Sequence, residues 1–93
     1  METKSLTILI NECVMLMRDV GYSEKSILRF KQIWDSKLNH FMSVKGFEHY
    51  SISIGEAFLA TLPEEKVLMS SHLRRSITIL DSVLQSASIS RYI

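Results

Sequence analysis

Two segments of this chain place apolar residues three and four positions apart, which is the spacing of one face of an α-helix. In the segment 23–42 these residues are Ile27, Phe30, Trp34, Leu38 and Phe41, and in the segment 73–89 they are Leu73, Ile77, Leu80 and Leu84. A helix with such a stripe becomes stable when the stripe packs against other apolar surface. The sequence therefore predicts at least two amphipathic helices that share a core.

The length and composition of the chain permit one such core. Ninety-three residues, of which 46% are hydrophobic, are enough for one compact domain and too few for two. Cys13 is the only cysteine, so the fold depends on packing rather than on disulfides, as is typical of cytoplasmic proteins. No run of about eighteen apolar residues occurs, so no membrane partner is expected. Asn11 and Glu12 interrupt the apolar run near the N-terminus, which argues against a signal peptide.

Glycine and serine residues mark the ends of the first two helices. Residues 1–21 hold an N-terminal helix, expected at about 5–20, and Gly21 closes it. Ser23 is a natural N-cap for the second helix, because its hydroxyl can accept a hydrogen bond from the first turn. This second helix is expected to run up to Gly46, which takes the left-handed conformation that ends many helices.

The next helix is short. Residues 46–51 form a connector, after which Ser53 and Glu56 match the capping-box pattern Ser-x-x-Glu. The helix that this box would start covers about residues 54–62. Pro63 cannot continue it, so a break is expected there.

A last long helix is expected from about Lys66 or Ser70 to Ser86. The sequence contains no repeat and no alternating strand pattern. The predicted fold class is therefore all-α, with residues 1–93 forming a single domain that is a compact bundle of four to five helices.

No group of residues in the sequence suggests catalysis. His40, His49 and His72 share no helical face and have no partner at metal-ligand spacing, so neither a metal nor a cofactor is expected. Cys13 lies in the apolar stripe of the first helix and is interpreted as a small core side chain. The three glycines are too far apart to form a phosphate-binding loop. The domain is therefore not expected to be an enzyme.

The largest side chains are assigned to the core. Trp34 lies mid-stripe in the second helix, and a tryptophan at such a position is typical of a core anchor because it buries a large area. The methionines, at positions 1, 15, 17, 42 and 69, are interpreted as fillers of gaps in the core rather than as a binding groove.

Basic and hydroxyl side chains lie off the two apolar stripes. On the second helix they share a ridge formed by Lys25, Arg29, Gln32 and Ser36. On the last helix the side opposite the stripe carries Ser71, Arg75, Thr78 and Ser82. Such ridges fit against the phosphate backbone of duplex DNA. An ordinary solvated face would carry the same residue types, so that alternative stays open.

These positions match a known pattern. The core-binding domain of tyrosine recombinases begins with a helix of the form S-x-x-T-x-x-x-Y-x-x-x-L-x-x-x-L-x-x-F, and the matching residues here are Ser23, Ser26, Phe30, Trp34, Leu38 and Phe41. The last helix of that domain resembles R-x-L-S-A-L-R-S-F-Y, matched by Arg75, Ile77, Thr78, Ile79, Leu80, Ser82, Val83 and Leu84, with Ile89 after them. Residues 22–90 therefore resemble this domain of the phage-integrase family. The sequence departs from the pattern at Asp81, where the family often has an arginine.

The resemblance implies a SAM-like helical domain that lies on one side of double-stranded DNA, while the catalytic domain of the same parent chain lies on the other. It implies a role in DNA integration or recombination, with catalytic residues confined to that other domain. Residues 88–93 would begin the linker, and Tyr92 would not be the nucleophile. The DNA contacts that the resemblance implies are Lys25, Arg29, Ser71, Arg74 and Arg75.

The net charge of the chain leaves a second interpretation open. A charge of +1 suggests contacts to only three or four phosphates, which gives a slope of log affinity against log salt of about −3 to −4 and a Kd of roughly 10⁻⁴ to 10⁻⁶ M. The domain on its own is expected to be monomeric. Alternatively, it is a helical protein–protein interaction module with no nucleic-acid role, whose broadly apolar first helix, residues 6–20, binds a partner helix or a second copy.

Overall fold

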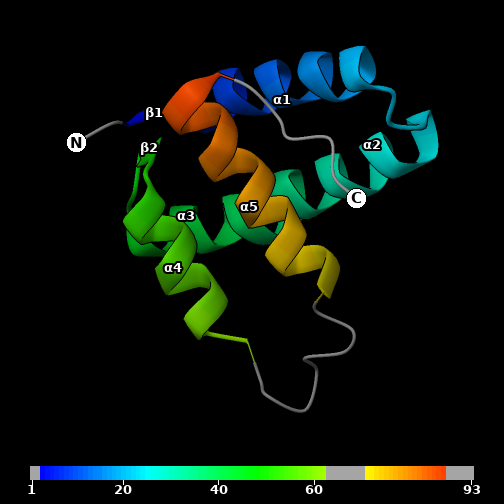
Figure 1. The fold of residues 1–93 in the computed structure, drawn as a ribbon. Helices are drawn as coiled ribbons and strands as arrows, with labels where there is room; N and C mark the ends of the chain where they lie inside the picture. The colour runs from blue at the N-terminus through cyan, green and yellow to red at the C-terminus, as the bar shows by residue number, and fades with distance from the viewer. Residues whose placement is uncertain (1–2, 63–70, 88–93) are drawn as a thin grey trace.

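Four helices and one short two-stranded ladder make up the described part of the chain, residues 3–62 and 71–87 of the computed structural model (Figure 1). The helical segments are α1 (Leu6–Val20), α2 (Glu24–Gln32), the π-helical η1 (Ile33–Leu38), α3 (Asn39–Lys45), α4 (Ile52–Ala60) and α5 (Ser71–Ser86). Because α2, η1 and α3 follow one another without a break, they form one long helix. The predicted all-α fold with four to five helices is confirmed.

The ladder joins the start of α1 to the connector before α4. Strand β1 (Lys4–Ser5) pairs antiparallel with β2 (His49–Tyr50), with Lys4 opposite Tyr50. The sequence predicted a plain connector here, because two residues are too few to show the alternation that marks a strand.

The ends of α1 and of the long helix agree with the prediction. Gly21 has a φ of 100° and Gly46 a φ of 78°, so both adopt the left-handed conformation that glycine enters without steric cost. Ser23 is the N-cap of α2, and its hydroxyl accepts a hydrogen bond from the backbone N–H of Ser26 at 3.2 Å. Local chemistry is sufficient to place these three boundaries.

The start of α4 differs from the prediction. Its N-cap is Ser51, and the backbone carbonyl of Ser51 accepts from the N–H groups of Ile54 and Gly55. Ser53 lies inside the helix, so the predicted capping box of Ser53 and Glu56 is wrong. The reason is the ladder: β2 ends immediately before Ser51, and the chain turns into the helix at that point.

The long helix contains a π-helical turn that the sequence did not predict. In η1 the backbone N–H of Asn39 donates to the carbonyl of Trp34, five residues earlier. Ile33, Trp34 and Leu38 of this turn are all buried. Apolar spacings of three and four cannot distinguish such a turn from an α-helix, because one widened turn changes the register by a single residue.

The core lies where α1 and the long helix pack against α5. Trp34 is completely buried, and its indole N–H donates to the backbone carbonyl of Ser76 at 3.2 Å. The predicted core anchor is therefore confirmed. Cys13 is also fully buried, and burial is the main reason why the pKa of its thiol rises to about 12. Its predicted role as a core side chain is confirmed, since a buried, protonated thiol is a poor nucleophile.

Helix α5 is buried over a wider arc than its predicted stripe. The stripe residues are buried or, in the first case, partly buried: Leu73, Ile77, Leu80 and Leu84. Three further side chains have almost no exposed surface: Ser76, Ile79 and Val83. The arc is wide because α5 packs against α1, the long helix and α4 at once. Its end at Ser86 agrees with the prediction.

Some expectations concern residues that lie outside the described part of the chain. They are the break at Pro63, the start of the last helix at Lys66 or Ser70, the gap-filling role of Met1 and Met69, and the linker character of residues 88–93. The side chain of Ser71 is outside it as well, although its backbone begins α5. These expectations stay predictions.

Candidate nucleic-acid interface

Four of the predicted DNA contacts have described side chains, and all four are exposed: Lys25 and Arg29 on α2, and Arg74 and Arg75 on α5. Helix α5 crosses the long helix and packs against α2 and η1 (Figure 1). The crossing brings the first turn of α5 to α2, where Nη1 of Arg29 lies 3.0 Å from Nε2 of His72. This contact joins two helices that lie far apart in the sequence.

The core holds the ring of His72 in place. This ring lies edge-to-face against Phe30, with the two ring centroids 6.3 Å apart. Phe30 is buried and stacks in turn on Trp34, with ring centroids 6.1 Å apart. The imidazole and the guanidinium that touches it therefore lie directly above the central aromatic residues of the core.

The direction of the hydrogen bond follows from the chemistry of the two side chains. A guanidinium has donors and no acceptor, so Arg29 donates and Nε2 of His72 accepts. An imidazole that accepts at Nε2 is neutral and carries its proton on Nδ1. In this arrangement the contact contains one charge, that of Arg29.

Helix geometry decides which arginine of α5 lies beside this contact. Arg75 follows His72 by three positions, so the two side chains share a face of the helix. Arg74 follows His72 by two positions, about 200° around the helix axis, and lies on the other side. On α2, Lys25 precedes Arg29 by one turn and shares its face. We call the residues brought together here the basic edge: Lys25, Arg29, His72 and Arg75.

The charges of the basic edge are not neutralised within residues 3–62 and 71–87. The ion pairs described there join Lys4 with Glu12, Arg18 with Glu24 and Lys31 with Asp35. Glu24 is the sequence neighbour of Lys25, but both of its carboxylate oxygens accept from Arg18. The positive charges of the edge are therefore available to an anion.

Two of the hydroxyl groups predicted to assist these cations, those of Ser36 and Thr78, are used inside their own helices. The hydroxyl of Thr78 donates to the backbone carbonyl of Arg74 at 3.0 Å, and that of Ser36 donates to the carbonyl of Gln32. A hydroxyl has a single hydrogen to donate. Neither group can therefore donate to a phosphate without first giving up its contact with the backbone.

Two polar residues gained a role that sequence reasoning had missed. His72 was set aside because nothing near it in the sequence suggested a partner. Asp81 was noted only as a departure from the family pattern, yet it accepts a hydrogen bond from the hydroxyl of Tyr50 at 2.7 Å. Burial raises the pKa of Asp81, and the hydrogen bond from Tyr50 opposes that rise. Asp81 thus serves the fold rather than the ligand surface.

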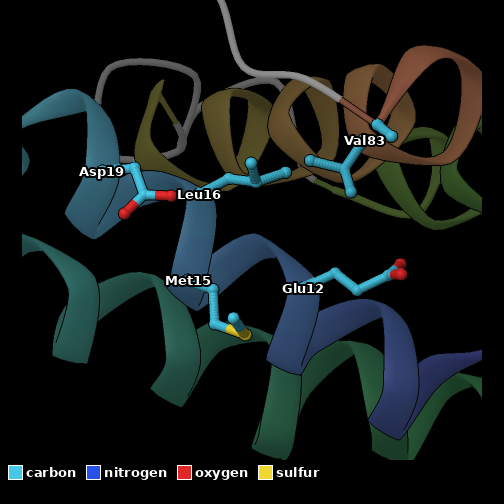
Figure 2. A pocket seen from close by; sticks show the side chains of 6 residues that line it. Glu12, Met15, Leu16, Asp19 and Val83 are labelled. Carbon is cyan, nitrogen blue, oxygen red and sulfur yellow. The ribbon is translucent and has the colours of Figure 1, made fainter.

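A second surface feature lies between α1 and the end of α5. A hollow of about 240 Å³ lies there, lined by Glu12, Met15, Leu16, Asp19, Val83 and Ala87. Figure 2 shows the side chains that line it. Met15 is 66% exposed and Ile8, two turns earlier on α1, is 54% exposed.

Met17 and Met42 are buried as predicted, but the prediction that Met15 fills a gap in the core is wrong. The reason is that α5 covers only one side of α1.

The chain matches no protein-family model, no curated protein and no solved structure. The resemblance to the core-binding domain of tyrosine recombinases stays a prediction that rests on the residues quoted for it.

Among the described helices, none is long and apolar enough to cross a membrane. Within the same residues, no three side chains of histidine, cysteine, aspartate or glutamate lie together as a metal ion would need.

Proposed function

We propose that this domain binds duplex DNA through the basic edge, as the non-catalytic core-binding domain of a tyrosine recombinase. The observation that carries the proposal is the contact between Arg29 of α2 and His72 of α5. It makes one surface out of the two helices on which the recombinase resemblance places its DNA contacts. An edge confined to a single helix could reach fewer phosphates.

The chemistry of the basic edge suits a phosphate backbone better than a base-specific site. Arginine and lysine side chains neutralise phosphates and release counterions, which gives affinity without sequence preference. With three cations, the edge supports a salt slope of about −3 and weak binding by the domain alone. The catalytic domain of the parent chain would add affinity by holding the DNA from the other side.

An amide-resonance titration with a short DNA duplex at low salt tests the proposal. We expect shifts concentrated in residues 23–36 and 71–82, and a smaller salt slope, by about 1, for the variant Arg75→Gln. Lys45→Gln is the matched control, because it removes the same charge from the far end of the long helix. A domain whose resonances in these two segments do not respond to DNA would contradict the proposal.

The hollow beside Met15 favours a second candidate, a module that binds a partner helix. An apolar groove next to exposed Ile8 and Met15 is the kind of surface that accepts an amphipathic helix. The variant Met15→Lys separates the two candidates. If the domain binds DNA through the basic edge, this variant should bind DNA as the parent chain does. If the domain binds a partner helix in the hollow, the variant should lose that partner. Sedimentation at rising concentration would reveal a second copy as the partner.

A further inference from the structure

His72 differs from the other members of the basic edge because its charge is not permanent. Histidine is the side chain that ordinarily changes charge between about pH 5 and 8. In the structure its Nε2 accepts from Arg29, so the ring is neutral and occupies one of the donors of the guanidinium. The edge therefore holds three permanent cations and one conditional one.

We propose that Arg29 and His72 together form a phosphate-binding pair in which His72 takes up a proton when the phosphate binds. This inference rests on the proposed function. It adds a phosphate contact shared by Arg29 and His72 and a dependence of DNA binding on pH. The proton comes from solvent and is held on Nε2. The hydrogen bond from Arg29 to His72 is replaced by two donors, one from each side chain, that point at oxygens of the same phosphate.

The distance between the two groups supports this exchange. Nη1 of Arg29 and Nε2 of His72 are 3.0 Å apart, so two N–H groups there can reach two oxygens of one phosphate. Without an anion, a protonated His72 would face the guanidinium at that distance, and the two like charges would repel. The phosphate removes this penalty, so anion binding and protonation favour each other.

The surroundings of His72 leave the anion as the balancing charge. From α2 the ring faces Arg29, with Lys25 one turn away, and on α5 itself Arg75 is one turn away. The remaining contact given by the structure is with the uncharged ring of Phe30. Within the described residues no carboxylate pairs with His72. A negative charge from a ligand can therefore decide whether the ring is protonated.

The test measures the affinity of the whole chain for a labelled DNA duplex, by fluorescence anisotropy at constant ionic strength. Between pH about 8 and 5.5 we expect affinity to rise by at least about ten-fold, the effect of one net hydrogen bond to a charged group. The salt slope should stay nearly the same at the lower pH, since His72 and Arg29 contact the same phosphate. Far-UV circular dichroism at each pH confirms that the domain stays folded.

Three variants make the result specific to this histidine. His72→Gln should lose the pH dependence and bind at every pH as the parent chain does near pH 8, whereas His72→Lys should bind tightly at every pH. His40→Gln, which removes an exposed histidine from α3, should keep the full dependence.

Each other outcome overturns the inference in a recognisable way. DNA binding that does not change with pH, or that keeps its pH dependence in His72→Gln, overturns the pair and leaves the proposed function standing. A chain that binds no DNA at any pH overturns both.

Discussion

Within the described residues, two hydrogen bonds join side chains of helix α5 to side chains from distant parts of the chain, and they differ in burial. Near its start, His72 accepts from Arg29, and both side chains are exposed. In its second half, Asp81 accepts from Tyr50, which has no exposed surface. A buried polar contact must be kept intact because its loss strands a polar group away from water. An exposed one can be exchanged for a ligand at little cost, and for this reason we propose the basic edge as the binding surface.

The largest expected effect comes from the core that lies between these two contacts. Trp34→Ala should lower the free energy of unfolding by about 3–5 kcal/mol, because it removes a fully buried indole and leaves a cavity. Urea unfolding followed by circular dichroism measures it. Phe47→Ala is the control, since Phe47 is 41% exposed and its loss should cost less than about 1 kcal/mol. If the variant does not fold, Trp34→Phe gives the comparison. Equal losses at positions 34 and 47 would show that the core is not built around Trp34.

A medium effect is expected at the buried contact, where α4 approaches Tyr50 at a glycine. A Cβ on Gly55 would overlap the hydroxyl of Tyr50 and lie 2.9 Å from Cγ2 of Ile77. Gly55→Ala should therefore destabilise the domain by about 2 kcal/mol, even though alanine is the better helix former. The control Ala57→Gly, on the exposed side of α4, should cost about 1 kcal/mol through helix propensity alone. A stabilised Gly55→Ala variant would mean that α4 does not pack this closely.

The smallest effect is a pH dependence at Asp81. Burial raises its pKa in the folded state, so folding favours the protonated carboxyl. Its contribution to stability is therefore present at acid pH and is lost as the pH rises through the folded-state pKa. Asp81→Asn keeps an acceptor for Tyr50 but cannot ionise. Relative to the parent chain, this variant should become more stable between pH about 3 and 7, by up to about 0.5 kcal/mol after solvent screening is allowed for.

The exposed contact between Arg29 and His72 can be compared with that of Asp81 by measuring the free energy of unfolding. Arg29→Gln should change the free energy of unfolding by less than about 0.5 kcal/mol at either pH, because its partner is exposed. Unfolding curves of the two variants at both pH values complete the comparison. An Arg29 variant that destabilises the fold more than the Gly55 variant does would reverse the distinction drawn between the two ends of α5.

Much of the candidate site was predictable, because its cations follow from helix periodicity. The ridge of Lys25 and Arg29 needs only a helix over residues 23–45, and Ser23 and Gly46 place that helix. What periodicity could not provide was the neighbour across the interface. His72 lies 43 positions from Arg29, and no local pattern records which turn of α5 meets α2. For the same reason, the sequence could not show that Arg75 lies beside that contact while Arg74 lies on the other side of the helix.

The sequence by itself determined the features that depend on neighbouring residues: the all-α class, the glycine and serine caps of the first two helices, and the burial of Trp34 and Cys13. Only the tertiary structure decided where distant segments meet. The β1–β2 ladder moved the start of α4 to Ser51, and incomplete cover by α5 left Met15 exposed. The pairing of Tyr50 with Asp81 was decided in the same way. Helix caps and stripes are set within one or two turns of the chain, whereas these contacts depend on the packing of whole helices.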